Sequence, residues 1–195
     1  MEIAIIDYGA GNIKSLQFAL QRLGYQAILS ADAAAIKSAD KVIFPGVGQA
    51  NNAMRKLKAS GLDVVIPKLT QPVLGICLGM QLLCSSSEEG NTEGLGVFDV
   101  DVKRFKTSLK IPHVGWNTIS GLQSTLFTNI PEKTFMYSVH SFYAPLVKET
   151  IALTNYGTQF SSALQKNNFY GVQFHPEKSS KLGEQLIKNF VELCE

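Results

Sequence analysis

Apolar and polar positions in the first part of the chain alternate between strand-like and helix-like patterns. Residues 2–8 form an apolar run typical of a buried strand, and apolar residues from Ile13 to Leu23 then recur at the spacing of one helix face. Asn12 stands where a helix N-cap is expected, and Gly24 where a left-handed C-cap is expected. Further strands are predicted over 25–30, 41–44 and 73–76, with helices over 32–39 and 50–58 and from Leu78 onward, and Pro45 is expected to end the third strand. This alternation is typical of a mostly parallel sheet covered by helices.

The pattern changes after residue 88. A polar, glycine-containing loop is followed by short strand-like runs over 97–105, 118–119, 135–143, 151–156, 161–165 and 170–174, and an amphipathic helix is predicted over 180–193. Pro67 interrupts a helix-like pattern over 62–71. Because no linker or repeat separates the two parts, we expect one α/β domain over residues 1–195, its mostly parallel sheet extended by antiparallel strands.

Composition and charge exclude several classes of protein. Apolar residues make up 45% of the chain and the net charge is +2, which argues against intrinsic disorder. The longest mostly apolar run, 73–84, is shorter than the ~20 residues of a membrane helix, and the first residues lack the basic start of a signal peptide. Three cysteines are too few for a disulfide framework, and an odd number cannot all pair within one chain. We therefore expect a cytoplasmic protein with neither a membrane nor a nucleic acid as its partner.

The segment with the most chemical content surrounds Cys77. A buried strand runs directly into a helix there, and Gly75 and Gly79 flank the cysteine at equal distance. Small flanking residues permit the sharp turn of a nucleophile elbow, and a helix N-terminus favours thiolate over thiol. The alternative is a small core residue, the usual role of an intracellular cysteine. Cys84, placed on the same helix face, is interpreted as packing, and Cys194 as inert.

A base for this thiol is expected at His175. It follows an apolar strand, and Glu177 lies two residues further, where an extended chain would bring both side chains to the same side. A carboxylate there can fix the imidazole tautomer, which gives a nucleophile, base and orienting acid. The alternative is an exposed turn. His113 and His140 have no such carboxylate, and His140 is interpreted as structural or substrate-lining.

The glycine-rich turn PGVG ends another predicted strand. Acyl transfer needs backbone N–H donors for the developing oxyanion, and we expect one from Leu78 and another from the segment Gly46, Val47 and Gly48. Without the elbow, this segment would be an ordinary turn.

Two other kinds of site are disfavoured. GAGNIK at 9–14 resembles the dinucleotide fingerprint in only two glycines, because Lys14 occupies the position that needs a small residue. Cysteine and histidine spacings do not suit zinc, and the lysines and arginine of 103–110 are interpreted as a solvated strand and loop. We expect neither cofactor nor metal.

Taken together, GICLGMQ, HPE and PGVG resemble the class I glutamine amidotransferases. IDYGAGN, PHVGWN and VHSFYA narrow the resemblance to the glutaminase subunits of imidazole glycerol phosphate synthases, enzymes of histidine biosynthesis. The resemblance spans almost the whole chain. It implies a three-layer, flavodoxin-like fold, hydrolysis of L-glutamine through a thioester on Cys77, and a triad completed by His175 and Glu177. The substrate-binding residues that it implies are Gln81, Ser138, Val139 and His140.

The resemblance also implies a partner, a (β/α)₈ barrel cyclase that forms a heterodimer with the glutaminase. The cyclase uses the ammonia to convert N'-(5'-phosphoribulosyl)formimino-AICAR ribonucleotide to imidazole glycerol phosphate and AICAR. The residues expected at the interface are Gly9, Ala10, Gly11, Asn12, Trp116, Asn117 and Lys178. A lone tryptophan in a glycine-flanked segment suits an interface anchor, and its alternative role is to fill the core.

Three other functions remain open at this point. The first is a class I glutaminase that serves anthranilate, aminodeoxychorismate or pyridoxal phosphate synthesis, which would share the triad. The second is a free-standing cysteine hydrolase of γ-glutamyl compounds, active without a partner. The third is a non-catalytic binding module in which Cys77 only packs.

Overall fold

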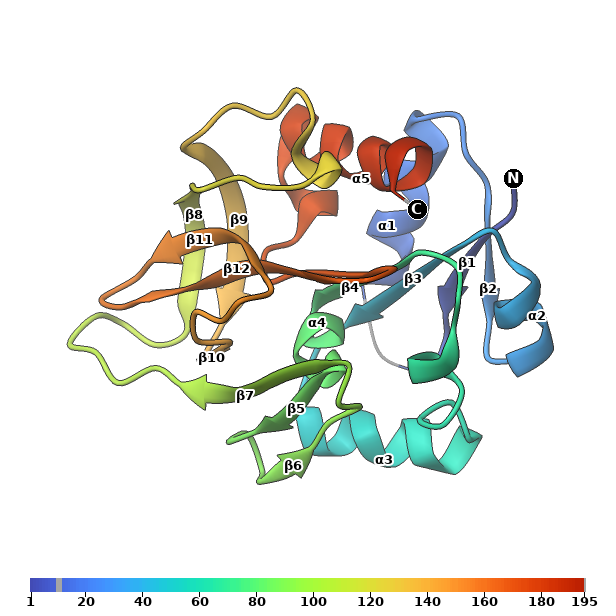
Figure 1. Cartoon of the computed structure of the whole chain (residues 1–195), viewed down its shortest axis with the longest axis horizontal. Helices are drawn as coiled ribbons and strands as arrows, with labels where there is room; N and C mark the ends of the chain where they lie inside the picture. The colour runs from blue at the N-terminus through green and yellow to red at the C-terminus, as the bar shows by residue number, and fades with distance from the viewer. Residues whose placement is uncertain (10–11, 195) are drawn as a thin grey trace.

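A seven-stranded sheet forms the centre of the molecule in the computed structural model, which describes residues 1–9 and 12–194 (Figure 1). In spatial order its strands are β11 (Thr150–Asn155), β12 (Gln159–Lys166), β13 (Phe169–Val172), β4 (Val73–Cys77), β3 (Lys41–Gly46), β1 (Ile3–Ile6) and β2 (Ala27–Ser30). The pairs from β13 to β2 are parallel, whereas β11, β12 and β13 pair antiparallel. The predicted mostly parallel sheet with an antiparallel extension is confirmed.

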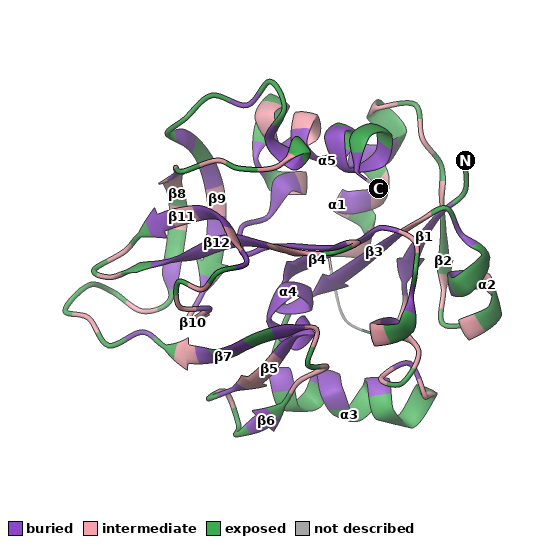
Figure 2. Ribbon diagram, in the orientation of Figure 1, coloured by how far each residue is buried: buried purple, intermediate pink, exposed green. Residues whose placement is uncertain are grey.

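Helices cover both faces of this sheet. Helices α1 (Ile13–Arg22) and α5 (Ser180–Leu193) lie on one face, and α2 (Ala33–Ser38), α3 (Ala50–Ser60) and α4 (Leu78–Leu83) contribute to the core on the other (Figure 1). Three short 3₁₀ turns are η1 (Ile66–Lys68), η2 (Thr125–Phe127) and η3 (Pro176–Lys178). Alternate residues of β1 face opposite cores, so the strand is buried throughout (Figure 2).

Two smaller sheets flank the centre. A four-stranded sheet contains β10 (Phe142–Tyr143), β7 (Phe98–Arg104), β5 (Cys84–Ser87) and β6 (Thr92–Glu93), and lies on the α3 side. Strands β8 (His113–Ile119) and β9 (Thr134–His140) form an antiparallel ribbon at the end of the molecule near β11 and β12 (Figure 1). Both sheets therefore lie toward the end of the molecule opposite β2.

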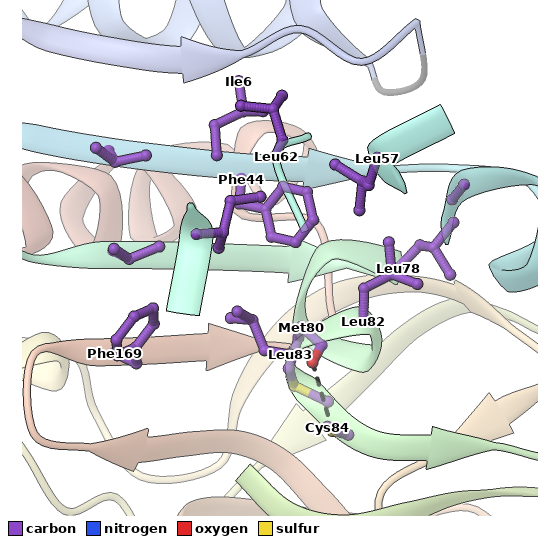
Figure 3. Close-up of a cluster of buried hydrophobic side chains, with 14 of the residues drawn as sticks. Ile6, Phe44, Leu57, Leu62, Leu78, Met80, Leu82, Leu83, Cys84 and Phe169 are labelled. Carbon is purple, nitrogen blue, oxygen red and sulfur yellow. Dashed lines mark hydrogen bonds between the residues drawn. The ribbon is translucent and has the colours of Figure 1, made fainter. Parts of the chain in front are cut away.

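The core on the α3 side explains how α4 is placed. Figure 3 shows its large apolar side chains, among them Phe44 of β3, Leu57 of α3, and Leu78, Met80 and Leu83 of α4. A Cβ atom on Gly79 would lie 1.9 Å from the Phe44 carbonyl oxygen, and one on Gly75 would lie 2.8 Å from Leu83 Cδ1. The helix backbone therefore approaches the sheet at a distance that only glycine permits.

Some predicted boundaries are wrong. Helix α4 ends at Leu83, so Cys84 begins strand β5 and does not lie on the helix face expected for it. Its burial is nevertheless complete, its Sγ donates to the Met80 carbonyl at 3.4 Å, and burial raises the pKa of the thiol. Strand β3 continues through Pro45 to Gly46, because a proline near a strand end removes only one donor from the ladder. The polar segment after residue 88 includes β6.

Caps were predicted at both ends of α1, and only the C-terminal one is confirmed. Gly24 has a φ of +86°, as expected after a helix C-terminus. Asn12 precedes the helix, but its side chain makes no capping hydrogen bond to the helix backbone. Instead, its Oδ1 accepts from Ser15 Oγ at 3.0 Å. Within the described residues, no helix has the length and apolar character needed to cross a bilayer.

Gly79→Ala should destabilise the protein far more than Gly61→Ala. The first substitution forces the new methyl group against the Phe44 carbonyl, and we expect it to lower the free energy of unfolding by about 3 kcal/mol. Gly61 has a positive φ of +71° but open space around it, so the variant should lose only about 1 kcal/mol. Urea unfolding of both variants checks this, and equal losses would contradict it.

Candidate active site

Cys77 occupies a strained turn between β4 and α4. Its φ is 53° and its ψ is −111°, a backbone conformation that residues with a Cβ rarely adopt. Such strain persists only where the surroundings enforce it, and here the glycine contacts of α4 fix both sides of the turn. The side chain is only 7% exposed. These are the features expected of a nucleophile elbow.

A pocket of about 360 Å³ opens beside Cys77. It is lined by Val47, Gly48, Cys77, Leu78, Gln81, Glu89, Pro112, Val139, His140, Ser141, Phe142, His175 and Lys178. The lining therefore combines the ends of β3 and β4 with the turn after β9 and the segment after β13. Parallel strands bring their carboxyl ends to one edge of a sheet, which is where such pockets form.

His175 and Glu177 meet beside the thiol. His175 Nδ1 lies 2.9 Å from Glu177 Oε1, so Nδ1 donates to the carboxylate and Nε2 is left for the hydrogen bond with Cys77. Burial alone would lower the pKa of the imidazole, but the hydrogen bonds to Cys77 and Glu177 outweigh burial and raise that pKa to about 10. The imidazole therefore carries two protons at neutral pH.

The local backbone differs from the one expected. His175 itself is extended, but the chain then turns into η3, so Glu177 reaches the imidazole through a 3₁₀ turn and not along an extended segment. The His175 N–H donates to the Tyr137 carbonyl at 2.8 Å, and Ser179 Oγ donates to the His175 carbonyl at 2.6 Å. The first bond holds the turn against β9, and the second closes the turn itself.

Glu177 is deeply enclosed. Its side chain is 2% exposed, and its Oε2 has no hydrogen-bond partner among the described residues. Asn12 Nδ2 approaches Oε1 at 3.5 Å. The amide of Asn12, a predicted interface residue, therefore lies against the carboxylate that orients His175.

The predicted oxyanion segment divides between two places. Val47 and Gly48 line the pocket with Leu78, and Gly48 has a φ of +94°. Gly46 pairs with Cys77 in the sheet, and a Cβ there would lie 2.5 Å from the Gly79 nitrogen. Gly46 therefore permits the close packing of α4, and it lines a smaller neighbouring cavity that shares Val47 and His175 with the pocket.

Three of the four predicted substrate-binding residues line the pocket. Gln81, Val139 and His140 line the pocket, whereas Ser138 is buried in β9 and does not. The pocket is instead completed by Ser141 and Phe142, which the sequence pattern did not indicate. The strand reaches the pocket only at its last residues, and the lining continues into the turn that follows.

Another residue that the sequence pattern did not indicate is Gln173. It is fully buried, its Nε2 donates to Cys77 Sγ at 3.7 Å, and its Oε1 accepts from Gln81 Nε2 at 2.8 Å. The one signal in the sequence is a polar residue at the end of an apolar strand, two positions before His175.

The remaining histidines form a buried pair. His140 Nδ1 donates to the Phe142 carbonyl at 2.8 Å, so its Nε2 accepts from His113 Nδ1 at 3.1 Å. Burial, opposed by the bond to Phe142, lowers the pKa of His140 to about 3, and burial also lowers that of His113. Both rings are neutral at physiological pH, which makes His140 both structural and pocket-lining.

The predicted interface residues lie in different environments. Trp116 is 51% exposed on β8 and does not fill the core. Asn117, on the opposite face of the strand, donates to the Asn155 carbonyl at 3.0 Å and approaches His113 Nε2 at 3.4 Å. Lys178 is exposed, with Nζ 6.0 Å from the centre of the Tyr137 ring.

The N-terminal part of the predicted interface is only partly described. Gly9 has a φ of +73°, and its carbonyl accepts from Lys56 Nζ at 2.6 Å. Ala10 and Gly11 lie outside the described residues. Across residues 1–9 and 12–194, no cluster of three His, Cys, Asp or Glu side chains is arranged to hold a metal ion.

The raised pKa of His175 should make stability fall in alkali. The folded-state pKa of about 10 exceeds the unfolded value of about 6.5, so the contribution of His175 is complete below pH 6.5 and is lost as the pH rises toward 10. Glu177→Gln removes one cause of the shift, so the free energy of unfolding should fall less over this range. Urea unfolding at several pH values measures it.

The matched control is Glu184→Gln, which breaks a pair with Arg22 and removes a carboxylate that does not contribute to the shift of the His175 pKa. It should keep the wild-type dependence on pH. Parallel curves for wild type and Glu177→Gln would contradict the assignment.

Comparison with known proteins identifies the family. The family model for glutamine amidotransferase class I matches residues 4–194. The imidazole glycerol phosphate synthase subunit HisH of Bacteroides fragilis (strain YCH46) is 57% identical over 196 residues, covering 99% of this chain and 100% of the relative. The subunit HisH of Yersinia pseudotuberculosis is 48% identical with the same coverage.

Solved structures support the same fold at much lower identity. PurLQS from Thermotoga maritima has a TM-score of 0.75 at 16% identity, covering 97% of each chain. A glutamine amidotransferase from the same organism has a TM-score of 0.66 at 17% identity, covering 98% of this chain and 82% of the other. The sequence and fold together lead to one conclusion: the chain belongs to the class I glutamine amidotransferases, in the branch of the imidazole glycerol phosphate synthase subunit HisH.

Proposed function

We propose that this chain is the glutaminase subunit of an imidazole glycerol phosphate synthase, with Cys77, His175 and Glu177 as its catalytic residues. The observation that carries the proposal is the meeting of a strained, pocket-facing cysteine with an imidazole whose other nitrogen is bound at 2.9 Å to a buried carboxylate. This is the arrangement required of a nucleophile, a base and its orienting group.

The first half of the reaction releases ammonia. The Cys77 thiolate attacks the side-chain amide carbon of glutamine, and the carbonyl oxygen becomes an oxyanion that backbone N–H groups of Leu78 and the segment Val47 to Gly48 can receive. His175, protonated at neutral pH, donates its Nε2 proton to the amide nitrogen. The carbon–nitrogen bond breaks, and ammonia leaves behind a γ-glutamyl thioester on Cys77.

The second half restores the enzyme. Having lost its Nε2 proton, His175 accepts a proton from a water molecule, which attacks the thioester carbon. The carbon–sulfur bond breaks and the thiolate is regenerated beside the imidazolium. The new γ-carboxyl group gives its proton to solvent as glutamate departs. Glu177 remains ionised throughout, because its function is to hold Nδ1–H and to stabilise the positive ring.

A partner fits both the chemistry and the surface. Ammonia in neutral water becomes ammonium, which cannot act as a nucleophile, so its transfer should be enclosed. Exposed apolar side chains gather on the β8–β9 ribbon, where Val114 is 56%, Trp116 51% and Phe135 59% exposed. Surfaces of this kind mark protein interaction sites. The curated relatives are named as synthase subunits, which favours the barrel cyclase as the partner.

The proposal also includes the compartment. All three cysteines are free and buried, and a reactive thiol at Cys77 requires a reducing environment. We place the protein in the cytoplasm.

Glutamate release should depend on the partner. We expect a low rate from glutamine with this chain alone and a strong rise when the barrel cyclase and its acceptor ligand are both present. Coupled detection of glutamate in three mixtures, with the chain alone, with the cyclase, and with cyclase and acceptor, measures this. Equal rates in all three would instead favour a free-standing γ-glutamyl hydrolase.

Cys77→Ala should abolish glutamine-dependent product formation, since no thioester can form. Added ammonium salt should still support the cyclase, because the cyclase site is intact. Cys84→Ala is the matched control: this thiol is buried and bonded to Met80, away from the pocket, and the variant should retain glutaminase activity. Equal activity of both variants would favour a non-catalytic role for Cys77.

Trp116→Ala should weaken the complex with the cyclase about tenfold or more, as expected for a central aromatic anchor. Phe18 of α1 is 57% exposed, so Phe18→Ala removes a comparable aromatic surface elsewhere and should leave the affinity unchanged. Isothermal titration with the cyclase compares them. Unchanged affinity in Trp116→Ala would exclude the tryptophan from the interface.

A further inference from the structure

Gln173 is a fully buried amide whose side-chain partners lie in the active site. It follows β13 and has an exposure of 0%. Burying an amide is costly unless it forms hydrogen bonds. Its Oε1 accepts from Gln81 Nε2 at 2.8 Å, and its Nε2 donates to Cys77 Sγ at 3.7 Å. The side chain thus bridges two residues of the pocket from behind.

A single main-chain carbonyl determines how both amides are oriented. Gln81 lies 3.0 Å from the Phe142 oxygen, which can only accept, so the atom of Gln81 at that position must be Nε2. The neighbouring atom of Gln173 must then be its oxygen, because Nε2 of Gln81 can only donate. This leaves the Nε2 of Gln173 facing the sulfur. If either amide were reversed, two acceptors or two donors would face each other and no hydrogen bond could form between them.

The orientation has a consequence for Gln81. Its two Nε2 hydrogens are both used, one by the Phe142 carbonyl and one by Gln173. The amide is therefore unable to flip without losing both bonds. Only its Oε1 remains as a hydrogen-bonding atom for a ligand in the pocket, so the side chain presents an acceptor.

The orientation also has a consequence for Cys77. A donor directed at sulfur stabilises the thiolate relative to the thiol. In the thiol form, the S–H group is 3.8 Å from the Val139 carbonyl and can donate to it. The Gln173 donor therefore favours the thiolate, whereas the Val139 carbonyl, as an acceptor, favours the thiol.

We propose that Gln173 is a positioning residue that donates an N–H to the Cys77 sulfur and fixes the amide of Gln81 as an acceptor toward the pocket. Its significance for catalysis rests on the proposed glutaminase function, but its effect on the sulfur does not. The residue itself touches no reacting atom other than the resting sulfur.

The test uses Gln173→Met, which retains the length of the side chain but removes its donor and acceptor. The rate of Cys77 alkylation by iodoacetamide is followed from pH 6 to 10 by mass spectrometry of the Cys77 peptide. We expect the pH of half-maximal rate to rise by about 1 unit, the size expected for one lost hydrogen bond to a charged group. The titratable groups around the thiol, His175, Glu177, His140 and Tyr8, stay unchanged in the variant.

Kinetics with the barrel cyclase and acceptor present separate the two effects of Gln173. Loss of the donor to sulfur should lower kcat for glutamine about tenfold, and release of Gln81 should raise KM. Gln165→Met is the matched control, because that glutamine lies on the neighbouring strand β12 and is not fully buried. It should keep the wild-type alkylation profile and both kinetic constants within about twofold.

Gln81→Met provides a second, independent variant if Gln173→Met folds poorly. It removes the contact that orients Gln173, so the alkylation profile should shift upward by about 0.5 unit, and the double variant should shift no further than Gln173→Met. Profiles superimposable on wild type in both single variants would overturn the proposal. Alkylation needs no glutaminase activity, so an inactive wild type would count against the proposed function alone.

Discussion

The approach of α4 to the end of β3 is the contact on which the rest of the site depends. Gly79 of α4 lies so close to β3 that a Cβ atom on it would be 1.9 Å from the Phe44 carbonyl oxygen. A Cβ atom on Gly46 of β3 would in turn lie 2.5 Å from the backbone nitrogen of Gly79. With the helix held there, the chain between β4 and α4 has no room to relax, and Cys77 retains a φ of 53°. The thiol, the pocket and the backbone of Leu78 all take their positions from this glycine contact.

Charge at the site is balanced among neighbouring side chains. His175 is protonated because it lies between a sulfur and a carboxylate, and the carboxylate is enclosed so that its negative charge acts mainly on the ring. The neighbouring histidine pair is uncharged instead, because burial without an acidic partner lowers the pKa of both His113 and His140. Two kinds of histidine therefore lie close together with different protonation, determined by whether a carboxylate shares their environment.

The parts of the site that depend on local sequence could be predicted. A cysteine between two glycines at a strand–helix junction, and a histidine followed two residues later by glutamate, indicate a nucleophile and its base once they occur together. The partners of Gln173 could not be predicted, because Gln81 and Cys77 are far from it in sequence and meet it only through the sheet order. Ser138, predicted to bind substrate, is not among the residues that line the pocket, because the sequence did not indicate that β9 reaches the pocket only at its last residues. Asn12 was expected to cap α1, but its Oδ1 accepts from Ser15 Oγ and its Nδ2 donates to the Glu177 carboxylate, a partner far away in the sequence.

The Phe142 carbonyl receives two donors, His140 Nδ1 at 2.8 Å and Gln81 Nε2 at 3.0 Å. Both of its lone pairs are thereby occupied, which fixes the plane of this peptide group. The carbonyl thus connects the buried histidines of the β8–β9 ribbon to the wall of the pocket. Because the acceptor belongs to the main chain, exchanging the side chain at position 142 does not remove either hydrogen bond. Substitutions at position 142 therefore change the pocket wall and its packing against the core but keep this acceptor, whereas insertions or deletions between His140 and Phe142 would displace the acceptor itself.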